Sequence, residues 1–455
     1  MIMHLGHSMS KDLFRPLLGT EKELKEEIKN SIIGVHKKQY FDYTASGLAY
    51  KAVESRIQEV LKTYANTHSK EASMAAKMDF YYKEARRHLK NSLKLEPDFA
   101  ILPSGCGATS AIKKFQEIIG IYIPPATRKR FNFQSDTLSR PLIIIGPYEH
   151  HSNEVSYREA LCDTVRIGIN SEGVIDLEQL EQILKTSKYR QVIGTFCIAS
   201  NVTGIITPFE KISALLRKYG AIVCFDAAAS SPYMNVPSSL YDAMFLSPHK
   251  LIGGPASCGL LVIRKELIDE SIAPTFAGGG TVMYVDRNAH NFIDEKESRE
   301  DAGTPGILQL IRAALAYQLR NEIGFIWIKK EKNRLLKHLL NGLLKIQRCK
   351  IYGNLQEDNI GIVSFNIEGI DPYLLCSYMS KQNGIQTRAG CSCAGPYGHD
   401  LLGLDDNSSM EEKPGWLRIS IHYSQEIEDI DYLLCVIKKS ILEIDKNCLK
   451  RIKSH

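Results

Sequence analysis

The chain has 455 residues, enough for two domains, and its 44% hydrophobic and 24% charged residues are typical of globular proteins. Its 57 lysines and arginines exceed its 52 aspartates and glutamates by only +5, so composition gives no support for nucleic-acid binding. No stretch approaches the roughly 20 consecutive apolar residues of a membrane span, and residues 1–19 lack the apolar core of a secretory signal. We therefore expect a cytoplasmic protein with no nucleic-acid and no membrane partner.

The first part of the chain predicts a large α/β domain at residues 61–325, preceded by a segment at 1–60 that packs with a smaller domain. A helix is expected from about Thr109 to Ile119, after a glycine turn, and residues 123–141 are interpreted as a surface insertion. Apolar strands then alternate with helices, which predicts a mostly parallel sheet covered on both faces. The predicted strands are 141–146, 191–200, 221–228, 242–247 and 259–264, and the helices between them are 176–187 and 209–220.

The pattern changes after about residue 325 and predicts a smaller α+β domain at residues 326–455. A long helical stretch at 311–345 is expected to be interrupted near Gly324. It is followed by strands at 361–367, 385–388 and 416–423 and by helices at 372–383 and 426–442.

Polar residues at the predicted strand ends indicate a ligand site, because ligands of open α/β sheets bind beyond the carboxyl ends of the strands. Lys250 follows the strand at 242–247, and a lysine in a closed pocket is desolvated into an effective amine nucleophile. Asp226 ends the strand at 221–228, and a carboxylate there can keep a pyridine nitrogen protonated. An isolated lysine would favour a surface interpretation, but this pair indicates pyridoxal 5'-phosphate (PLP).

Three further stretches favour the same cofactor. Gly107, Ala108 and Thr109 open a helix after a glycine turn, a cradle for phosphate that could also serve a nucleotide. His150 follows the strand at 141–146 with a flat ring that could stack on a flat cofactor, and Asn201 could donate a hydrogen bond to a ring oxygen. Strand ends that converge on one lysine–aspartate pair therefore predict a PLP site.

The 11 cysteines are an odd number, and most lie in apolar runs, where we interpret them as buried small hydrophobic residues rather than disulfides. These are Cys162, Cys197, Cys224, Cys258, Cys376 and Cys435. Cys391 and Cys393 differ, because they lie among small residues in "RAGCSCAGPYGH". Their C-x-C spacing, with only His399 nearby, is unlike a structural zinc site, so we expect no metal.

At this point the chain resembles the class V aminotransferase superfamily of PLP enzymes, in the branch of cysteine desulfurases and selenocysteine lyases. The matching stretches run in order from residue 41 to about 440: "FDYTASG", "YANTHS", "GCGATSAI", "EHHSN", "SNVTG", "FDAAA", "SPHKLIGGP", "GGGT", "REDAGTPG", "RAGCSCAG" and "LRIS". The resemblance implies the α/β fold of type I PLP-dependent transferases, with a mostly parallel seven-stranded sheet, helices on both faces and a smaller α+β domain.

The resemblance also implies a role for each matching residue. Lys250 would form the Schiff base with PLP, Asp226 would pair with the pyridinium, and His150 and Ala228 would cover the two faces of the ring. Thr281 would reach the phosphate in the neighbouring subunit, which implies a homodimer. The remaining implied contacts are Gly107, Ala108, Thr109, Ser247 and His249 to the phosphate, Asn201 to the ring oxygen and the substrate, and Arg418 with Arg388 to the substrate carboxylate.

Desulfurases of this branch carry their nucleophile in a loop of the form R-x-G-x-x-C-A, and Arg388, Gly390, Cys393 and Ala394 fit that spacing. The resemblance implies removal of sulfur or selenium from L-cysteine or selenocysteine, which leaves alanine and a persulfide on Cys393 for a possible acceptor protein. The chain departs from the family pattern in three places. Ala229 stands where the family commonly has glutamine or histidine, "DYTASG" differs from the more usual motif, and Cys391 falls where no cysteine is required. An aminotransferase or C–S lyase with a non-catalytic cysteine loop, and a non-catalytic sulfur carrier or regulator, remain alternatives.

Overall fold

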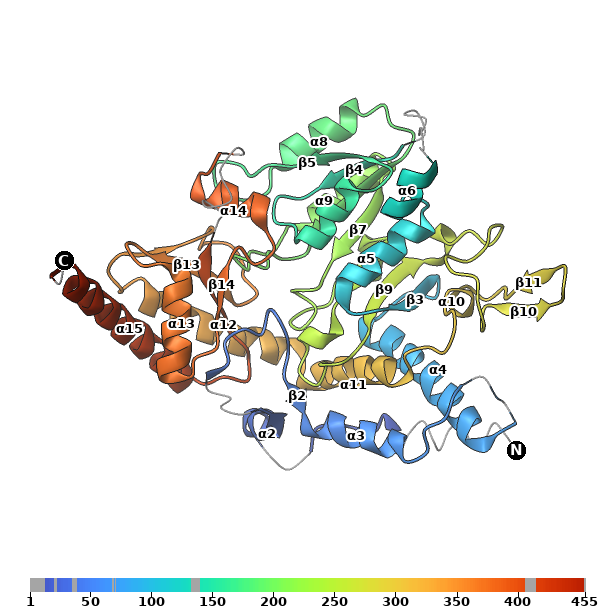
Figure 1. The fold of residues 1–455 in the computed structure, drawn as a ribbon, viewed down its shortest axis with the longest axis horizontal. Helices are drawn as coiled ribbons and strands as arrows, with labels where there is room; N and C mark the ends of the chain where they lie inside the picture. Colours follow the sequence, from blue (N-terminus) through green and yellow to red (C-terminus); the bar gives the residue numbers. More distant parts are fainter. Residues whose placement is uncertain are drawn as a thin grey trace.

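The computed structural model describes residues 13–19, 23–34, 39–67, 69, 71–131, 140–405 and 415–453 (Figure 1). A seven-stranded sheet with the order β3-β9-β8-β7-β6-β4-β5 forms the centre of the large domain. Neighbouring strands among β4 to β8 are parallel, whereas β9 is antiparallel to both β8 and β3. The bounds are β3 Phe99–Ser104, β4 Leu142–Ile145, β5 Asp163–Arg166, β6 Val192–Cys197, β7 Ile222–Asp226, β8 Ala243–Leu246 and β9 Gly259–Arg264. The predicted mostly parallel sheet is confirmed.

Alternate residues of the central strands enter two different cores, as the two-residue period of a strand requires. In β8, Ala243 and Phe245 lie in the core beneath α5, whereas Met244 and Leu246 lie in the core on the other face. Helix α5 (Gly107–Ile118) begins two residues before the expected start at Thr109. The second core contains residues of α4 (Ser73–Leu93), α8 (Leu177–Thr186), α9 (Phe209–Lys218) and α11 (Ile307–Ile323). Helices therefore cover both faces of the sheet, as predicted.

The smaller domain is built on a four-stranded antiparallel sheet with the order β12-β13-β15-β14, which confirms the predicted α+β organisation (Figure 1). Its strands are β12 Cys349–Ile351, β13 Ile362–Ile367, β14 Arg388–Gly390 and β15 Trp416–Ser420, and its helices are α12 Phe325–Leu343, α13 Pro372–Asn383 and α15 Ile427–Lys453. The expected break at Gly324 is present: its φ of +87° separates α11 from α12.

Three boundaries in the smaller domain differ from expectation. The strand predicted at 385–388 begins only at Arg388, because Gln386 makes an isolated bridge to Tyr40 in the N-terminal segment. The strand predicted at 416–423 ends at Ser420. The last helix extends to Lys453 rather than residue 442.

The N-terminal segment contacts both domains. Asp42 makes an isolated bridge to Ser420 of β15, and Lys25 of α2 (Leu24–Ser31) forms ion pairs with Glu331 of α12 and with Glu426. Helix α3 (Lys51–Leu61) instead packs against α11 of the large domain. The segment therefore bridges the two domains and carries Thr44 and Ala45 into the space between them.

Two smaller expectations concern the surface and the thiols. Within the predicted insertion at 123–141, Pro125–Phe131 form helix α6, and residues 132–139 lie outside the described part. Every cysteine among the described residues is a free thiol, and Cys162, Cys197, Cys224 and Cys258 are buried as predicted. Cys435 is exposed and Cys376 is half-buried, because only part of each helix faces the core. Over the described ranges, the helices are too short or too polar to cross a bilayer.

Candidate active site

A pocket of about 210 Å³ lies at the carboxyl ends of β6, β7 and β8, between the two domains. Every residue named above as a candidate lines it, except Thr281 and the nucleophile candidate Cys393. The lining residues are Thr44, Ala45, Cys106, Gly107, Ala108, Thr109, Tyr148, His150, Ser152, Cys197, Ala199, Asn201, Asp226, Ala228, Ala229, Ser247, His249, Lys250, Arg388, Ser392 and Arg418. The fold therefore brings residues from both domains and from the N-terminal segment to one place.

Lys250 ends a short 3-10 turn, Pro248–Lys250, directly after β8. The turn needs glycine at position 254, where a Cβ would lie 1.9 Å from the carbonyl oxygen of Pro248. Burial lowers the pKa of Lys250 to about 8, although the nearby Asp226 carboxylate opposes this shift. The amine thus loses its proton far more readily than that of an exposed lysine, which makes Lys250 a competent nucleophile.

Asp226 is the last residue of β7 and is nearly completely buried. Its Oδ1 accepts the backbone N–H of Ala228 at 2.8 Å. Burial raises the pKa of Asp226, while the Ala228 amide and the charge of Lys250 act in the opposite direction. A buried carboxylate on a pocket wall is costly unless a positive group pairs with it, so this wall of the pocket fits a protonated ring nitrogen.

The start of α5 also lines the pocket and forms a cradle for an anion. No side chain caps the helix at Cys106, and Ser247 Oγ accepts the N–H of Ala108 at 2.8 Å. Gly107 has a φ of +69°, and a Cβ there would meet the His249 ring at 2.8 Å. The start of α5, the Ser247 hydroxyl and the His249 ring thus converge on one site that suits a phosphate.

His150 follows β4 and lies on the pocket wall with its ring fixed by its own turn. The N–H of Ser152 donates to His150 Nδ1 at 3.1 Å. Burial lowers the pKa of His150 to about 4, helped by the charge of Lys250. The ring is therefore a neutral, flat surface near neutral pH. Its neighbour Glu149 anchors the turn, because Glu149 accepts the N–H of Cys197 at 2.7 Å and the side-chain amide of Asn153 at 2.6 Å.

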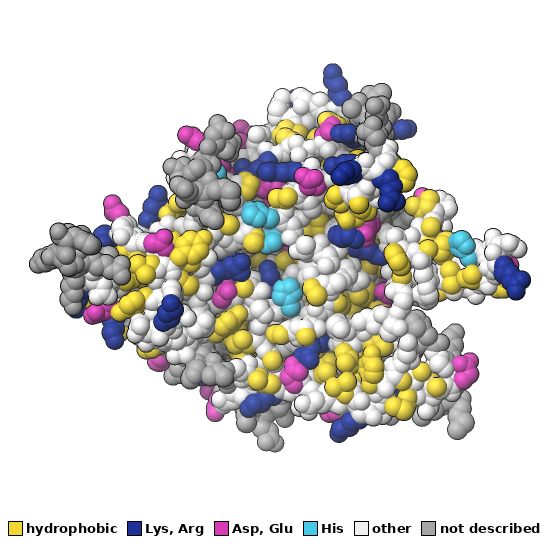
Figure 2. All heavy atoms as spheres, in the orientation of Figure 1, with side chains coloured by type: hydrophobic (Ala, Val, Ile, Leu, Met, Phe, Trp, Pro, Cys, Tyr) yellow, Lys and Arg dark blue, Asp and Glu magenta, His cyan; other side chains and the backbone are white. Residues whose placement is uncertain are grey.

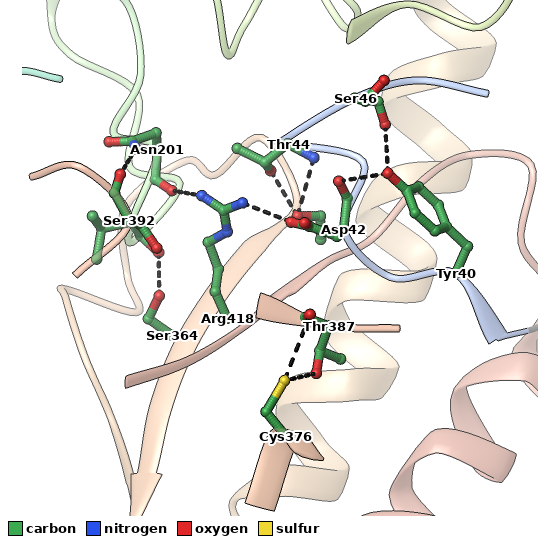
Figure 3. Close-up of polar contacts among 12 residues, drawn as sticks. Tyr40, Asp42, Thr44, Ser46, Asn201, Ser364, Cys376, Thr387, Ser392 and Arg418 are labelled. Atoms are coloured by element: carbon green, nitrogen blue, oxygen red, sulfur yellow. Dashed lines mark hydrogen bonds and ion pairs between the residues drawn. The ribbon is translucent and has the colours of Figure 1, made fainter. Parts of the chain in front are cut away.

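Arg418 of β15 lines the pocket from the smaller domain, and Figure 3 shows its guanidinium between Asn201 and Asp42. It forms an ion pair with Asp42 at 2.7 Å and donates to the backbone oxygen of Asn201 at 3.0 Å. Burial lowers the pKa of Arg418, and the Asp42 charge opposes that shift. Asp42 was not predicted as a site residue, although it is part of the stretch "FDYTASG", which matches the family.

Three buried polar atoms around Arg418 have no hydrogen-bond partner in the described structure: Arg418 Nε, Asn201 Oδ1 and Ser392 Oγ. Buried polar groups in proteins are almost always paired. Three unpaired ones on the wall of a single pocket therefore indicate a polar ligand, and the donors on Arg418 suit a carboxylate. Ser392 was not predicted as a site residue either, because the prediction for this loop concerned the cysteines on either side of it.

The loop that carries Cys391 and Cys393 has an unusual backbone. Ser392 and Cys393 have φ angles of +54° and +58°, a left-handed conformation that is costly for residues other than glycine. The Asn201 side-chain amide donates to the carbonyl oxygen of Ser392 at 2.7 Å. Ser392 lines the pocket, whereas the pocket lining includes neither Cys391 nor Cys393. In this arrangement both candidate thiols lie beside the pocket rather than in its wall.

Thr281 is buried but does not line the pocket of its own chain. Its hydroxyl donates to the carbonyl oxygen of Gly278 at 2.8 Å. It directly precedes β10 (Val282–Val285), which forms an antiparallel hairpin with β11 (His290–Phe292). This hairpin projects from the large domain (Figure 1).

The chain matches the model of the family Aminotransferase class-V over residues 39–433. It is 27% identical over 426 residues to a protein of Pyrococcus abyssi named "Probable cysteine desulfurase", covering 92% of this chain and 98% of that relative. A protein of the same name from Halalkalibacterium halodurans is 28% identical over 304 residues, 66% of this chain and 70% of the relative.

Solved structures are similar over nearly the whole chain. The apo structure of a cysteine desulfurase from Thermococcus onnurineus NA1 superposes with a TM-score of 0.77 at 25% identity, covering 92% of this chain and 99% of that one. The Escherichia coli cysteine desulfurase CsdA gives a TM-score of 0.74 at 20% identity, covering 92% and 98%, and supports the fold alone. With a family match that spans both domains and the whole pocket, this chain belongs to the class-V aminotransferase family of enzymes.

Proposed function

We propose that this chain is a PLP-dependent cysteine desulfurase that takes sulfur from L-cysteine, or selenium from selenocysteine, and leaves alanine. The observation that carries the proposal is the placement of the Cys393 loop at the edge of a pocket that contains both Lys250 and Arg418. The names of the relatives support the same reaction.

The pocket residues fit PLP. The N-terminus of α5 with Ser247 and His249 would hold the phosphate, and Asp226 would pair with the ring nitrogen. His150 and Ala228 would cover the two ring faces, and Lys250 would hold the cofactor covalently. When bound, PLP supplies an electron sink for the carbon atoms of the substrate amino acid. Ala229 cannot donate to the ring oxygen, so we assign that contact to Asn201 alone.

Each of these residues has a separate role in the proposed reaction. Arg418 binds the substrate carboxylate with its fixed guanidinium donors, and Asp42 holds Arg418 in place. Lys250 Nζ removes the proton from the substrate α-carbon, a task that its lowered pKa favours. The Cys393 thiolate attacks the substrate sulfur, so that an S–S bond forms while the C–S bond breaks. The electron pair of the broken bond stays on the β-carbon, which takes up the proton released when the Cys393 thiol ionised, and Lys250 returns its proton to the α-carbon. The products are alanine and a Cys393 persulfide for an acceptor protein. Because Cys393 must be a thiol, we place the reaction in a reducing compartment such as the cytoplasm.

Product analysis tests this function. Purified protein with L-cysteine and a thiol reductant should release alanine and sulfide in equal amounts. Pyruvate with sulfide would instead indicate a C–S lyase, and a keto acid formed only with an added amino-group acceptor would indicate an aminotransferase. Absence of any product with cysteine and selenocysteine would favour a non-catalytic sulfur carrier or regulator.

We further propose that the enzyme is a homodimer whose β10–β11 arm serves the neighbouring subunit. The side chains of Met283, Tyr284 and Val285 are 65%, 59% and 58% exposed, and Figure 2 shows apolar side chains along this projecting arm. A lone two-stranded hairpin is marginally stable in water, and clustered exposed apolar residues mark interfaces. Docking of the arm would bring the turn that ends at Thr281 beside the partner's phosphate site, and Thr281, which is buried in the single chain, does not line the pocket of its own chain.

Val285→Asp should weaken the dimer, because dimerisation would bury an unpaired carboxylate. We expect the dimer dissociation constant to rise about 100-fold, the effect of losing a strong interface contact. Light scattering coupled to gel filtration over a concentration series measures it. Leu442→Asp, on the exposed face of α15, is the matched control and should leave the dimer intact. A dimer unaffected by Val285→Asp would place the subunit interface elsewhere.

A further inference from the structure

The loop that carries Cys393 is tied to the segment that carries His150 by a side chain that the reaction above does not use. The N–H of His151 donates to the carbonyl oxygen of Cys393 at 2.8 Å. In return, the N–H of Gly395 donates to His151 Nε2 at 2.8 Å. His151 therefore contacts the loop on both sides of Ala394.

This pair of bonds satisfies a specific need of the loop. Gly395 is the first residue of α14 (Gly395–Leu402), and the first N–H groups of a helix have no partner inside the helix. The residue before it, Ala394, has no side-chain acceptor, whereas most helices use serine, threonine, asparagine or aspartate there. His151 supplies the missing acceptor from a different domain.

The ring of His151 can accept only while Nε2 carries a lone pair. Burial lowers the pKa of His151, Glu154 opposes this shift and Arg158 adds to it. The ring is accordingly neutral, with its proton on Nδ1 when Nε2 accepts from Gly395. The contact is close, because a Cβ on Gly395 would lie 3.1 Å from Nε2.

The loop needs such support because its backbone is strained. Ser392 and Cys393 both have left-handed φ angles, and such conformations persist only where surrounding contacts enforce them. In the described structure this stretch is held by the amide of Asn201 on the carbonyl of Ser392, by His151 on Cys393 and Gly395, and by a turn bond from the N–H of Ala394 to the carbonyl of Cys391 at 3.1 Å. Asn201 holds the peptide group before Cys393, whereas His151 holds the peptide group after it and the start of α14.

We propose that His151 is a positioning residue that sets where the Cys393 thiol is presented beside the pocket. The inference rests on the proposed function, in which Cys393 is the nucleophile. His151 contributes no atom to the reaction: it holds the backbone of Cys393 and the start of α14, and it couples the loop to the turn that places His150.

The test compares His151→Ala with His151→Gln in the 455-residue chain loaded with PLP. The side-chain oxygen of glutamine can accept the Gly395 N–H, so glutamine should rescue what alanine loses. The readouts are kcat and KM for alanine formation and the rates at which iodoacetamide labels Cys393 and Cys391, followed by peptide mass spectrometry. We expect His151→Ala to lower kcat about tenfold, as the loss of one hydrogen bond would, with KM within about twofold. The labelling rate of Cys393 relative to Cys391 should change, and His151→Gln should restore both values.

His338→Ala is the matched control, since His338 lies on α12 and pairs with Asp431, and it should leave every readout unchanged. Unchanged kcat and labelling in His151→Ala would overturn the proposal, as would equal losses in the alanine and glutamine variants. If His151→Ala fails to fold, His151→Gln alone tests the proposal. The proposal predicts that Cys393 is labelled in this variant at the wild-type rate, and an altered rate would contradict it. Labelling does not depend on turnover. A rescued labelling pattern in an enzyme that makes no alanine from cysteine would therefore refute the proposed function and leave the role of His151 intact.

Discussion

Lys250→Ala should reduce alanine formation from L-cysteine by about 10⁴-fold or more, the scale seen when a covalent nucleophile is removed. Lys250 lies in the turn that follows β8, with Asp226 of β7 close enough to influence its charge, and burial lowers its pKa to about 8. Lys250 is thus both the amine that holds PLP and the base that moves the α-proton. Borohydride treatment of the wild-type enzyme should attach PLP covalently to the Lys250 peptide, which mass spectrometry identifies.

The Lys250→Ala variant needs a matched control. Lys113 is an exposed lysine on α5, paired with Glu117, and Lys113→Ala should keep both activity and PLP attachment. If PLP became fixed by borohydride to another lysine in Lys250→Ala, or if turnover survived, the assignment of Lys250 would be wrong. Asp226→Ala offers a second check: it should retain PLP and lose turnover, because an unprotonated pyridine ring is a poor electron sink.

Cys393→Ser should abolish sulfide release, whereas Cys391→Ser should retain most of it. The spacing from Arg388 and Gly390 selects Cys393, and the contacts of His151 and Asn201 hold the loop around that residue. A serine hydroxyl cannot form a persulfide, so the fall should be about 10³-fold or more, as for other nucleophile replacements. Cys391 is half-buried against the core of the large domain and should affect at most the onward passage of sulfur.

Sulfide release is measured with L-cysteine in the presence of a thiol reductant, and KM is compared with that of the wild type. Cys393→Ser should still bind L-cysteine, because Arg418 and Asp42 are unchanged. If Cys391→Ser were inactive and Cys393→Ser active, the nucleophile would be Cys391 rather than Cys393. Full activity in both variants would leave a C–S lyase or an aminotransferase.

Much of the fold could be predicted because the central strands are buried on both faces. The apolar runs of β4, β6, β7, β8 and β9 are a direct consequence of that burial. The edge strands β3 and β5 were not predicted. In β5, "DTVR" has no apolar run, and in β3 Pro103 interrupts the pattern, which an edge strand tolerates because one side needs no ladder hydrogen bonds.

The pocket could be predicted as far as its residues follow strand ends or match motifs. Lys250, Asp226 and His150 fall in this group, since the carboxyl ends of parallel strands meet at one edge of the sheet. The ion pair between Arg418 and Asp42 could not be predicted, because the two residues are 376 positions apart and pair only when the N-terminal segment lies against β15.

The backbone geometry of the cysteine loop also could not be predicted from the sequence. The left-handed conformations of Ser392 and Cys393 occur at residues that rarely adopt them, so no local propensity indicates them. The same holds for His151, whose neighbours in "EHHSN" gave no reason to separate it from His150. Its role depends on a helix start that lies 244 positions further along the chain.

The most direct test of the central claim is a single turnover with sulfur-labelled L-cysteine in the absence of reductant. The account predicts that the Cys393 peptide gains the mass of one labelled sulfur atom, and that one alanine forms for each modified site. Treatment with a thiol reductant should then release the label as sulfide and restore the original peptide mass. Labelled sulfide released at once, with pyruvate formed and Cys393 unmodified, would contradict the account.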